Sequence, residues 1–202
     1  MTATPIWPRD EVLAATKGQA GASDVAWAAT GVSIDSRTCQ PGDLFVAVTG
    51  ENFDGHDFLS EAFKAGAAAA ITSRDIDAGG APLIRVDDGL HALSNLGRAA
   101  RDRTDAPVVA ITGSVGKTGT KEAMAMALGA LGPTHATAGN LNNHIGVPLT
   151  LARMPRDVQF AVIELGMNHA GEISDLSKLA RPNVGVITTI AAVHLEFFDH
   201  VA

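Results

Sequence analysis

The chain has 202 residues, 46% of them hydrophobic and 18% charged, which is enough for one large core or two modest ones. Lys and Arg number 15 against 22 Asp and Glu, and the net charge of −7 disfavours binding to a nucleic-acid backbone. The single cysteine, Cys39, excludes an intrachain disulfide and fits a reducing compartment. Charged residues at 9–11 argue against a secretory signal, and the most apolar run, 65–71, is far shorter than the roughly 20 residues that cross a bilayer. We therefore expect a soluble, cytoplasmic, globular protein.

Helices and strands are both predicted in the N-terminal half of the chain. Apolar residues at Phe58, Leu59 and Ala62 recur with helical spacing, and Gly66 suits the C-terminal cap of that helix. The turn-forming residues 40–43 precede a short apolar run of strand character. The prediction for this half is helices over 8–16, 56–64 and 88–101, and strands over 32–35, 44–48, 68–72 and 83–86.

A regular alternation of strands and helices follows the turn-prone segment 104–107. Strands are predicted over 108–112, 134–137, 160–164 and 184–188, and helices over 117–131, 145–153 and 172–180. This alternation predicts right-handed βαβ units and a parallel sheet covered on both faces. The expected fold class is α/β, with an N-terminal domain over 1–103 and a second domain over 107–202. Because a doubly wound sheet usually has more strands, we expect the second domain to be incomplete.

The segment 112–118, Thr-Gly-Ser-Val-Gly-Lys-Thr, lies between a buried strand and a helix and is called the phosphate loop below. Gly113 and Gly116 let the backbone curl so that successive N–H groups converge on a phosphate. The N-terminal end of the following helix adds positive potential. Lys117 supplies a charge to the β- and γ-phosphates, and the Thr118 hydroxyl can ligate Mg²⁺. The pattern predicts nucleotide binding.

The phosphate loop is shorter than the usual motif. Only Ser114 and Val115 separate Gly113 from the Gly-Lys pair, where the usual pattern has about four residues. The alternative is a glycine-rich turn that carries Lys-Thr by chance, which the preceding strand and the following helix disfavour.

Two further polar residues follow predicted strands. Glu164 ends the strand over 160–164, where a carboxylate suits a magnesium ion held between protein and phosphates. His194 follows the strand over 184–188 and can ligate a metal or carry a proton. The alternatives are a solvated or helix-capping Glu164 and a structural His194. Together with the phosphate loop, these two strand ends predict a single site at which all three groups come together.

Amide side chains gather in the segment 139–143, Gly-Asn-Leu-Asn-Asn, called the Asn segment below. Asn side chains suit turns and helix caps. Asn140, Asn142 and Asn143 can equally hydrogen-bond a polar substrate, and from the residues alone both interpretations stand.

These motifs together resemble the Mur ligases of peptidoglycan synthesis. The resemblance rests on the phosphate loop, which is that family's own short variant, on the Asn segment, on Glu-Leu-Gly-Met-Asn at 164–168 and on Ala-Val-His-Leu-Glu at 192–196. Three further segments are similar to the N-terminal substrate domain that the last two Mur ligases of peptidoglycan synthesis share. They are Asp-Ser-Arg at 35–37, Pro-Gly-Asp-Leu-Phe-Val-Ala at 41–47 and Asp-Gly-His at 54–56. The Asn segment is most similar to the members that add D-alanyl-D-alanine.

The resemblance implies ATP-dependent amide ligation, with ATP and Mg²⁺ as cofactors. ATP would phosphorylate the terminal carboxylate of UDP-N-acetylmuramoyl-tripeptide, and the amine of D-Ala-D-Ala would attack the acyl phosphate. It also implies a UDP-substrate domain over 1–103, part of a phosphate-loop ATPase domain with a parallel sheet over 107–202, and a monomeric full-length enzyme. Binding to nucleic acid is not expected, and neither is insertion into a membrane.

Site residues follow from the resemblance by position. The ATP phosphates would be held by Gly113, Ser114, Val115, Gly116, Lys117, Thr118 and Gly119. Thr118 would bind one magnesium ion and Glu164 and His194 a second, and Lys117, Glu164 and His194 would serve catalysis. The uridine part of the substrate would face Ile34, Ser36, Glu51, Asn52 and Phe53. The sugar-peptide or metal region would face Asn140, Asn142 and Asn143.

Two departures from the family pattern bear on these expectations. Gly119 stands where Ser or Thr is usual, which removes a hydroxyl. Family members are also much longer, so the chain resembles a fragment that is expected to be inactive alone. The alternatives are a sister ligase that adds the third amino acid and a non-catalytic module that binds a UDP-sugar.

Overall fold

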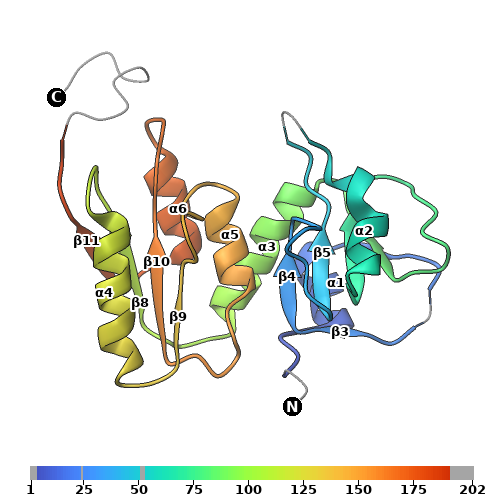
Figure 1. The fold of residues 1–202 in the computed structure, drawn as a ribbon, viewed down its shortest axis with the longest axis horizontal. Helices are drawn as coiled ribbons and strands as arrows, with labels where there is room; N and C mark the ends of the chain where they lie inside the picture. Colours follow the sequence, from blue (N-terminus) through green and yellow to red (C-terminus); the bar gives the residue numbers. More distant parts are fainter. Residues whose placement is uncertain (1–3, 24, 51–52, 192–202) are drawn as a thin grey trace. The chain divides into compact units, whose positions relative to one another are not determined.

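The computed structural model describes residues 4–23, 25–50 and 53–191 (Figure 1). Its chain divides into two compact units, Met1–Ala99 and Ala100–Ala202. The division falls inside helix α3 (Gly89–Asp102).

The first unit is built on a sheet with the strand order β2-β7-β6-β5-β4. Its strands are β2 (Gln19–Ala20), β4 (Gly31–Ser33), β5 (Asp43–Val46), β6 (Ala69–Thr72) and β7 (Leu83–Arg85). Strands β4 to β7 are parallel, and β2 pairs antiparallel with β7 at the edge. Every residue of β5 and β6 is buried, as expected for central parallel strands covered on both faces.

Helices and one further strand pair complete the first unit. They are β1 (Trp7–Pro8), which pairs antiparallel with β3 (Ala28–Ala29), and α1 (Arg9–Thr16), the 3-10 helix η1 (Gly55–Phe58) and α2 (Leu59–Lys64). The sequence pattern does not predict β1, β2 or β3, because two residues are too few for an alternating pattern.

Two predicted elements of this unit are altered by local hydrogen bonds. The strand predicted over 32–35 ends at Ser33, whose hydroxyl donates to the Asp35 carbonyl at 3.0 Å and closes a turn. The helix predicted over 56–64 begins as a 3-10 turn, because the Asp54 carboxylate accepts the His56 N–H at 3.0 Å.

The second unit confirms the predicted α/β class with parallel strands. Its described strands are β8 (Val108–Thr112), β9 (Thr134–Ala136), β10 (Phe160–Glu164) and β11 (Val184–Ile187), in the order β11-β8-β10-β9. All three pairings are parallel. The helices are α4 (Lys117–Gly129), α5 (Gly146–Ala152) and α6 (Glu172–Ala180). β8, β10 and α6 begin and end where the pattern predicts them.

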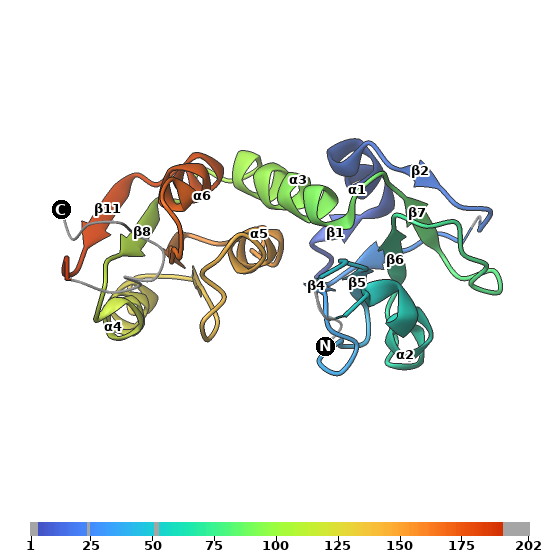
Figure 2. The same cartoon turned by 90° about the horizontal axis from the view of Figure 1, so that it is seen from above.

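Helices cover both faces of this sheet. The connection through α4 crosses from β8 to β9, whereas those through α5 and α6 run back in the opposite direction. Right-handed crossovers in opposite directions lie on opposite faces. Figure 2 shows α4 and α6 on opposite sides of β8 and β11. The reversal falls between β8 and β10, the point at which open α/β sheets form a crevice for ligands.

Arg101 ties the end of α3 to the second unit. The side chain is buried and donates hydrogen bonds to the carbonyls of Ala180 and Thr104, each at 3.0 Å. These bonds satisfy a buried guanidinium and explain why the last turn of α3 belongs with the second unit. Throughout the described ranges, the helices are too short or too polar to cross a membrane.

Candidate functional site

The phosphate loop connects β8 to the first turn of α4. Gly113 has a φ of +130°, a backbone conformation that side-chain-bearing residues rarely adopt. A Cβ atom there would lie 2.3 Å from Oγ1 of Thr188, so the close packing also requires glycine. Gly116 precedes α4, which begins at Lys117 and therefore directs the free N–H groups of its first turn toward the loop.

The segment after β11 anchors the phosphate loop. The Ser114 N–H donates to the Thr189 carbonyl at 2.7 Å, and the Ser114 hydroxyl donates to the Ala191 carbonyl at 3.0 Å. Oγ1 of Thr188 donates to the Val115 carbonyl at 2.7 Å. Several hydrogen bonds from the end of the neighbouring strand thus fix the loop, and the Ser114 hydroxyl is already engaged.

Three predicted phosphate-binding residues lie in the first turn of α4. The Lys117 ammonium donates to the carbonyls of Gly113 (2.6 Å) and Ser114 (3.4 Å), so the lysine folds back over the phosphate loop. Thr118 and Gly119 are exposed. This turn presents a cation and a hydroxyl beside the free N–H groups of a helix N-terminus, an arrangement suited to an anion.

Glu164 is placed at the neighbouring strand end. It closes β10 and pairs in register with Ile111 of β8, immediately before the phosphate loop. Glu164 is only 1% exposed, and its Oε1 accepts a hydrogen bond from Nδ2 of Asn142 at 2.8 Å. Its Oε2 is buried and finds no hydrogen-bond partner among the described residues. An unpartnered buried carboxylate oxygen is costly, and it is the type of ligand that Mg²⁺ prefers.

The amides of the Asn segment have different surroundings. Asn142 reaches Glu164, and its carbonyl accepts the Gly166 N–H at 2.8 Å. A Cβ on Gly166 would lie 2.7 Å from the Asn142 side chain, so this contact requires the glycine. Asn143 accepts the N–H groups of Ile145 (3.1 Å) and Gly146 (2.8 Å) and so caps α5.

The contacts of the Asn segment are compatible with both a structural role and a role at a binding site. Asn143 makes the capping contacts typical of a structural residue, whereas Asn142 contacts the candidate metal ligand. Asn140 is exposed and accepts the Asn142 N–H through its backbone carbonyl at 2.8 Å. Their roles toward a substrate stay predictions.

His194 lies outside the described residues, as do Glu51 and Asn52. Within the described part, β11 neighbours β8, so the strand that precedes His194 ends beside the phosphate loop. The same part holds no group of three or more His, Cys, Asp or Glu side chains arranged to bind a metal. The predicted pairing of Glu164 with His194 stays a prediction.

The first unit contains a cavity of about 560 Å³ that we call the aromatic cavity. It is lined by Ile34, Asp35, Ser36, Arg37, Phe45, Val48, Phe53, Gly55, Phe58 and Glu61. The structure therefore brings together Ile34, Ser36 and Phe53, three of the predicted uridine-facing residues. Phe53 is 74% exposed, and an exposed ring beside a cavity offers a stacking surface to a planar ligand.

Asp35 and Arg37 add a charged pair to the aromatic cavity. Nε of Arg37 contacts Oδ1 of Asp35 at 2.9 Å, and Nη2 contacts Oδ2 at 2.6 Å. The hydrogen bonds from Arg37 hold the pKa of Asp35 below its ordinary value, despite an opposing effect of burial. The sequence pattern did not predict that Asp35 and Arg37 would line this cavity, although a polar Asp-Ser-Arg run after a predicted strand could have indicated it.

A buried histidine braces the turn that leads out of Phe53. Nδ1 of His56 lies 2.5 Å from Oδ1 of Asp54, and Arg74 contacts the other carboxylate oxygen. Burial raises the pKa of Asp54, but hydrogen bonds from His56 and the charges of His56 and Arg74 outweigh it, so the pKa lies below its ordinary value. This network holds one wall of the aromatic cavity in place.

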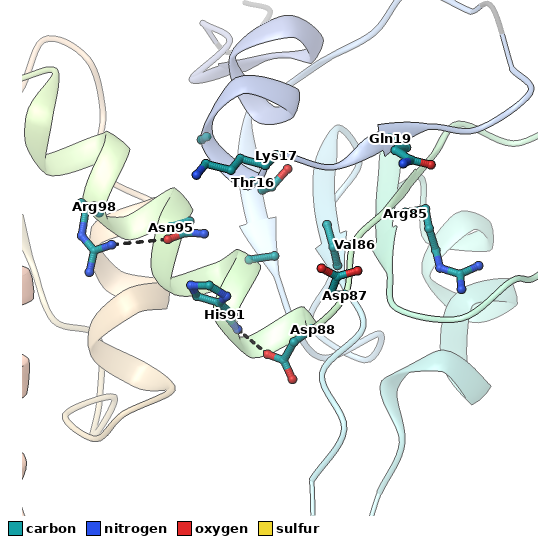
Figure 3. Close-up of a pocket in the computed structure, with 12 residues that line it drawn as sticks. Thr16, Lys17, Gln19, Arg85, Val86, Asp87, Asp88, His91, Asn95 and Arg98 are labelled. Carbon is teal, nitrogen blue, oxygen red and sulfur yellow. Dashed lines mark hydrogen bonds between the residues drawn. The ribbon is translucent and has the colours of Figure 1, made fainter.

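A second cavity of the first unit, of about 770 Å³, lies among α1, β7 and α3 (Figure 3). Both acidic and basic side chains line it, among them Lys17, Arg85, Asp87, Asp88 and Arg98. The contacts drawn in Figure 3 stay within α3 and its N-terminal cap, namely Arg98 to Asn95 and the His91 N–H to Asp88. None of the predicted site residues lines this second cavity.

Sequence profiles of two domains match the chain. The profile described as "Mur ligase family, catalytic domain" matches residues 28–101, and the profile described as "Mur ligase middle domain" matches residues 111–202. The UDP-N-acetylmuramoyl-tripeptide–D-alanyl-D-alanine ligase of Escherichia coli K12 is 47% identical over 171 residues, covering 85% of this chain and 38% of the relative. The Bacillus subtilis ligase of the same name is 43% identical over 168 residues, covering 82% and 37%.

Solved structures agree with these sequence matches. A crystal structure of MurF from Acinetobacter baumannii has a TM-score of 0.86 and 38% identity, and the match covers 98% of this chain and 43% of that chain. MurF ligase from Thermotoga maritima, in complex with ADP, has a TM-score of 0.69 and 34% identity, with coverage of 85% and 40%. The chain therefore spans well under half the length of these relatives.

Proposed function

The chain belongs to the Mur ligase family, and from this premise we propose that it forms the N-terminal and central parts of an ATP-dependent ligase that joins D-Ala-D-Ala to UDP-N-acetylmuramoyl-tripeptide. Residues 1–103 would bind the UDP-linked substrate, and residues 107–202 would form part of the ATP-binding domain. The observation that carries the proposal is the placement of Glu164 opposite Ile111, next to the phosphate loop, at the reversal point of a parallel sheet.

The proposed reaction has two steps. The γ-phosphoryl group of ATP passes to the tripeptide carboxylate, and the amine of D-Ala-D-Ala then displaces phosphate from the acyl phosphate as the amide bond forms. Phosphoryl transfer depends on positioning and charge stabilisation more than on a reactive side chain. The phosphate loop, with Lys117 and the N–H groups of α4, supplies both toward the nucleotide.

Magnesium would be held by hard oxygen ligands at this sheet edge. Thr118 offers an exposed hydroxyl and Glu164 a buried carboxylate oxygen without a partner, and these donors fit Mg²⁺. His194 is proposed as a further ligand from the family resemblance. Bound Mg²⁺ would neutralise part of the phosphate charge. Asn142 orients the Glu164 carboxylate through its 2.8 Å hydrogen bond.

The aromatic cavity is the proposed uridine site. Ile34 and Phe53 would contact the base, and Ser36 would offer hydrogen bonds, with Glu51 and Asn52 assigned by resemblance alone. An apolar cavity with a few polar groups is the common form of a small-molecule site. The proposed compartment is the cytoplasm, where ATP is available, and the proposed full-length enzyme is a monomer.

Ligand titrations followed by NMR on this chain test the assignment of the two units. UDP is expected to shift resonances around the aromatic cavity, and Mg-ADP to shift those around the phosphate loop. Shifts by UDP confined to residues after 107 would contradict the proposed division of labour. Binding of UDP without any binding of ADP would instead favour a non-catalytic UDP-sugar module.

A further inference from the structure

Helix α4 carries a second lysine one turn after Lys117, and its surroundings are different. Lys121 is 0% exposed. Its ammonium donates to the carbonyls of Thr137 (2.8 Å) and Gly139 (3.3 Å) and lies 2.8 Å from Oε1 of Glu122. Because it is enclosed by these oxygens, Lys121 cannot contact a phosphate in the way proposed for Lys117.

Burial of a lysine ammonium lowers the stability of the fold unless its partners compensate, so the partners of Lys121 indicate its role. Removal of an ammonium from water carries a large free-energy cost unless hydrogen bonds compensate for it. A buried apolar side chain would avoid that cost, but it would leave the Thr137 and Gly139 carbonyls without this donor. Lys121 thus ties the backbone at 137–139 to α4.

The backbone that Lys121 holds leads directly to the candidate metal ligand. Oγ1 of Thr137 accepts the Glu164 N–H at 2.9 Å, and Gly139 opens the Asn segment. Three residues later, Asn142 donates to Oε1 of Glu164 at 2.8 Å, which leaves Oε2 unpartnered. Contacts therefore run from Lys121 through the 137–142 backbone to both the main chain and the carboxylate of Glu164.

We propose that Lys121 is a positioning residue that holds the Asn segment so that the Glu164 carboxylate is presented to the divalent cation of the bound nucleotide. This inference rests on the proposed function, because it needs a magnesium nucleotide at the phosphate loop. It assigns different tasks to two lysines on one helix. Lys117 acts on the phosphates directly, and Lys121 acts on the metal only through Asn142 and Glu164.

The test separates magnesium-dependent from magnesium-independent nucleotide binding. ADP is titrated calorimetrically into the 202-residue chain and its Lys121→Met variant, once with EDTA and once with Mg²⁺. We expect affinities in EDTA to agree within about twofold, because the phosphate loop is unchanged. The gain in affinity from Mg²⁺ is expected to fall by about tenfold or more, the usual cost of losing a residue that orients a metal ligand.

Two further variants complete the design. Lys178→Met makes the same chemical change at a lysine of α6 that is 73% exposed, and it is expected to keep the full Mg²⁺ gain. Asn142→Ala changes a partly exposed side chain at the other end of the contact series, and it is expected to lose the gain as Lys121→Met does. If Lys121→Met does not fold, Asn142→Ala together with Lys121→Arg, which keeps a cation at this position, decides the question.

The outcomes distinguish this inference from the proposed function. Failure of the wild-type chain to bind ADP under either condition would overturn both. Normal ADP binding with an intact Mg²⁺ gain in Lys121→Met, or in Asn142→Ala, would overturn the positioning role alone. An equal loss of affinity with and without Mg²⁺ would also overturn it, since that result indicates general damage to α4. A Mg²⁺-specific loss that Lys121→Arg restores would support it.

Discussion

The side-chain amide of Asn142 donates a 2.8 Å hydrogen bond to Oε1 of Glu164, and the second carboxylate oxygen is left buried without a partner. The bond holds the carboxylate in one orientation at the end of β10. A fixed acceptor at the sheet edge that also bears the phosphate loop is what a metal–phosphate site requires.

Replacement of Lys117 by alanine is expected to weaken ADP binding by tenfold to about a hundredfold. The reason is the loss of a charge-assisted contact worth about 1.5–3 kcal/mol. The fold should persist, because the Lys117 ammonium contacts only two carbonyls of the phosphate loop. Calorimetric titration with ADP and a thermal melt measure both effects. Near-normal affinity in a folded variant would show that the phosphate loop is not the nucleotide site.

A matched pair of glycine substitutions tests the geometry of the phosphate loop. Gly113→Ala is expected to destabilise the second unit by about 1–3 kcal/mol, because its φ is +130° and the new Cβ would meet Oγ1 of Thr188. Gly119→Ala is expected to stabilise α4 by up to about 1 kcal/mol, because a Cβ there meets open space within the helix. Urea unfolding of both variants gives the comparison, and effects of the same sign would contradict this account.

Replacement of Phe53 by alanine is expected to weaken UDP binding by about 1–3 kcal/mol, the range found when a ring that stacks on a base is removed. Stability should change little, because Phe53 is 74% exposed. Val25→Ala, at another exposed apolar residue outside the cavity lining, serves as the control and should keep full affinity. UDP titration followed by NMR measures each. Unchanged affinity in Phe53→Ala would remove the aromatic cavity as the uridine site.

The stability of the second unit is expected to fall as the pH decreases from about 6.5. Burial holds the pKa of His135 below its ordinary value of 6.5, and the charge of Arg153 adds to this effect against the opposing hydrogen bond to the Thr150 carbonyl. The unfolded chain therefore takes up a proton at a pH where the folded unit does not, and the free energy of unfolding decreases toward acid.

Urea unfolding at about pH 7.5 and about pH 5.5 measures this decrease. His135→Gln should show a smaller difference between the two conditions. His144→Gln, at an exposed histidine, should retain the wild-type difference. An undiminished difference in His135→Gln would assign the pH dependence to other groups.

Local sequence pattern was sufficient for the regular elements of the second unit. β8 and β10 are apolar runs with clear flanking turns, and both have the predicted bounds. Short-range signals also predicted the strand–loop–helix arrangement around the phosphate loop, because a glycine-rich turn between strand and helix is contained within a few residues. The sequence pattern did not predict the short strands β1 to β3, because they form through pairing with strands elsewhere in the chain and have no alternating pattern of their own.

The contacts made by Lys121 and by Glu164 join residues far apart in the chain, and no local pattern encodes them. Lys121 looks like an ordinary helix-surface lysine in the sequence, and only the packing of α4 against β9 and β10 encloses it and directs its ammonium to Thr137. Likewise, Asn142 and Asn143 are adjacent and chemically identical, yet one orients Glu164 and the other caps α5. Residue type and spacing determined which groups could bind a phosphate or a metal. The order of strands in the sheet decided which of them meet, because Glu164 gains its partner Asn142 from the loop after the neighbouring strand β9 rather than from its own neighbours in the chain.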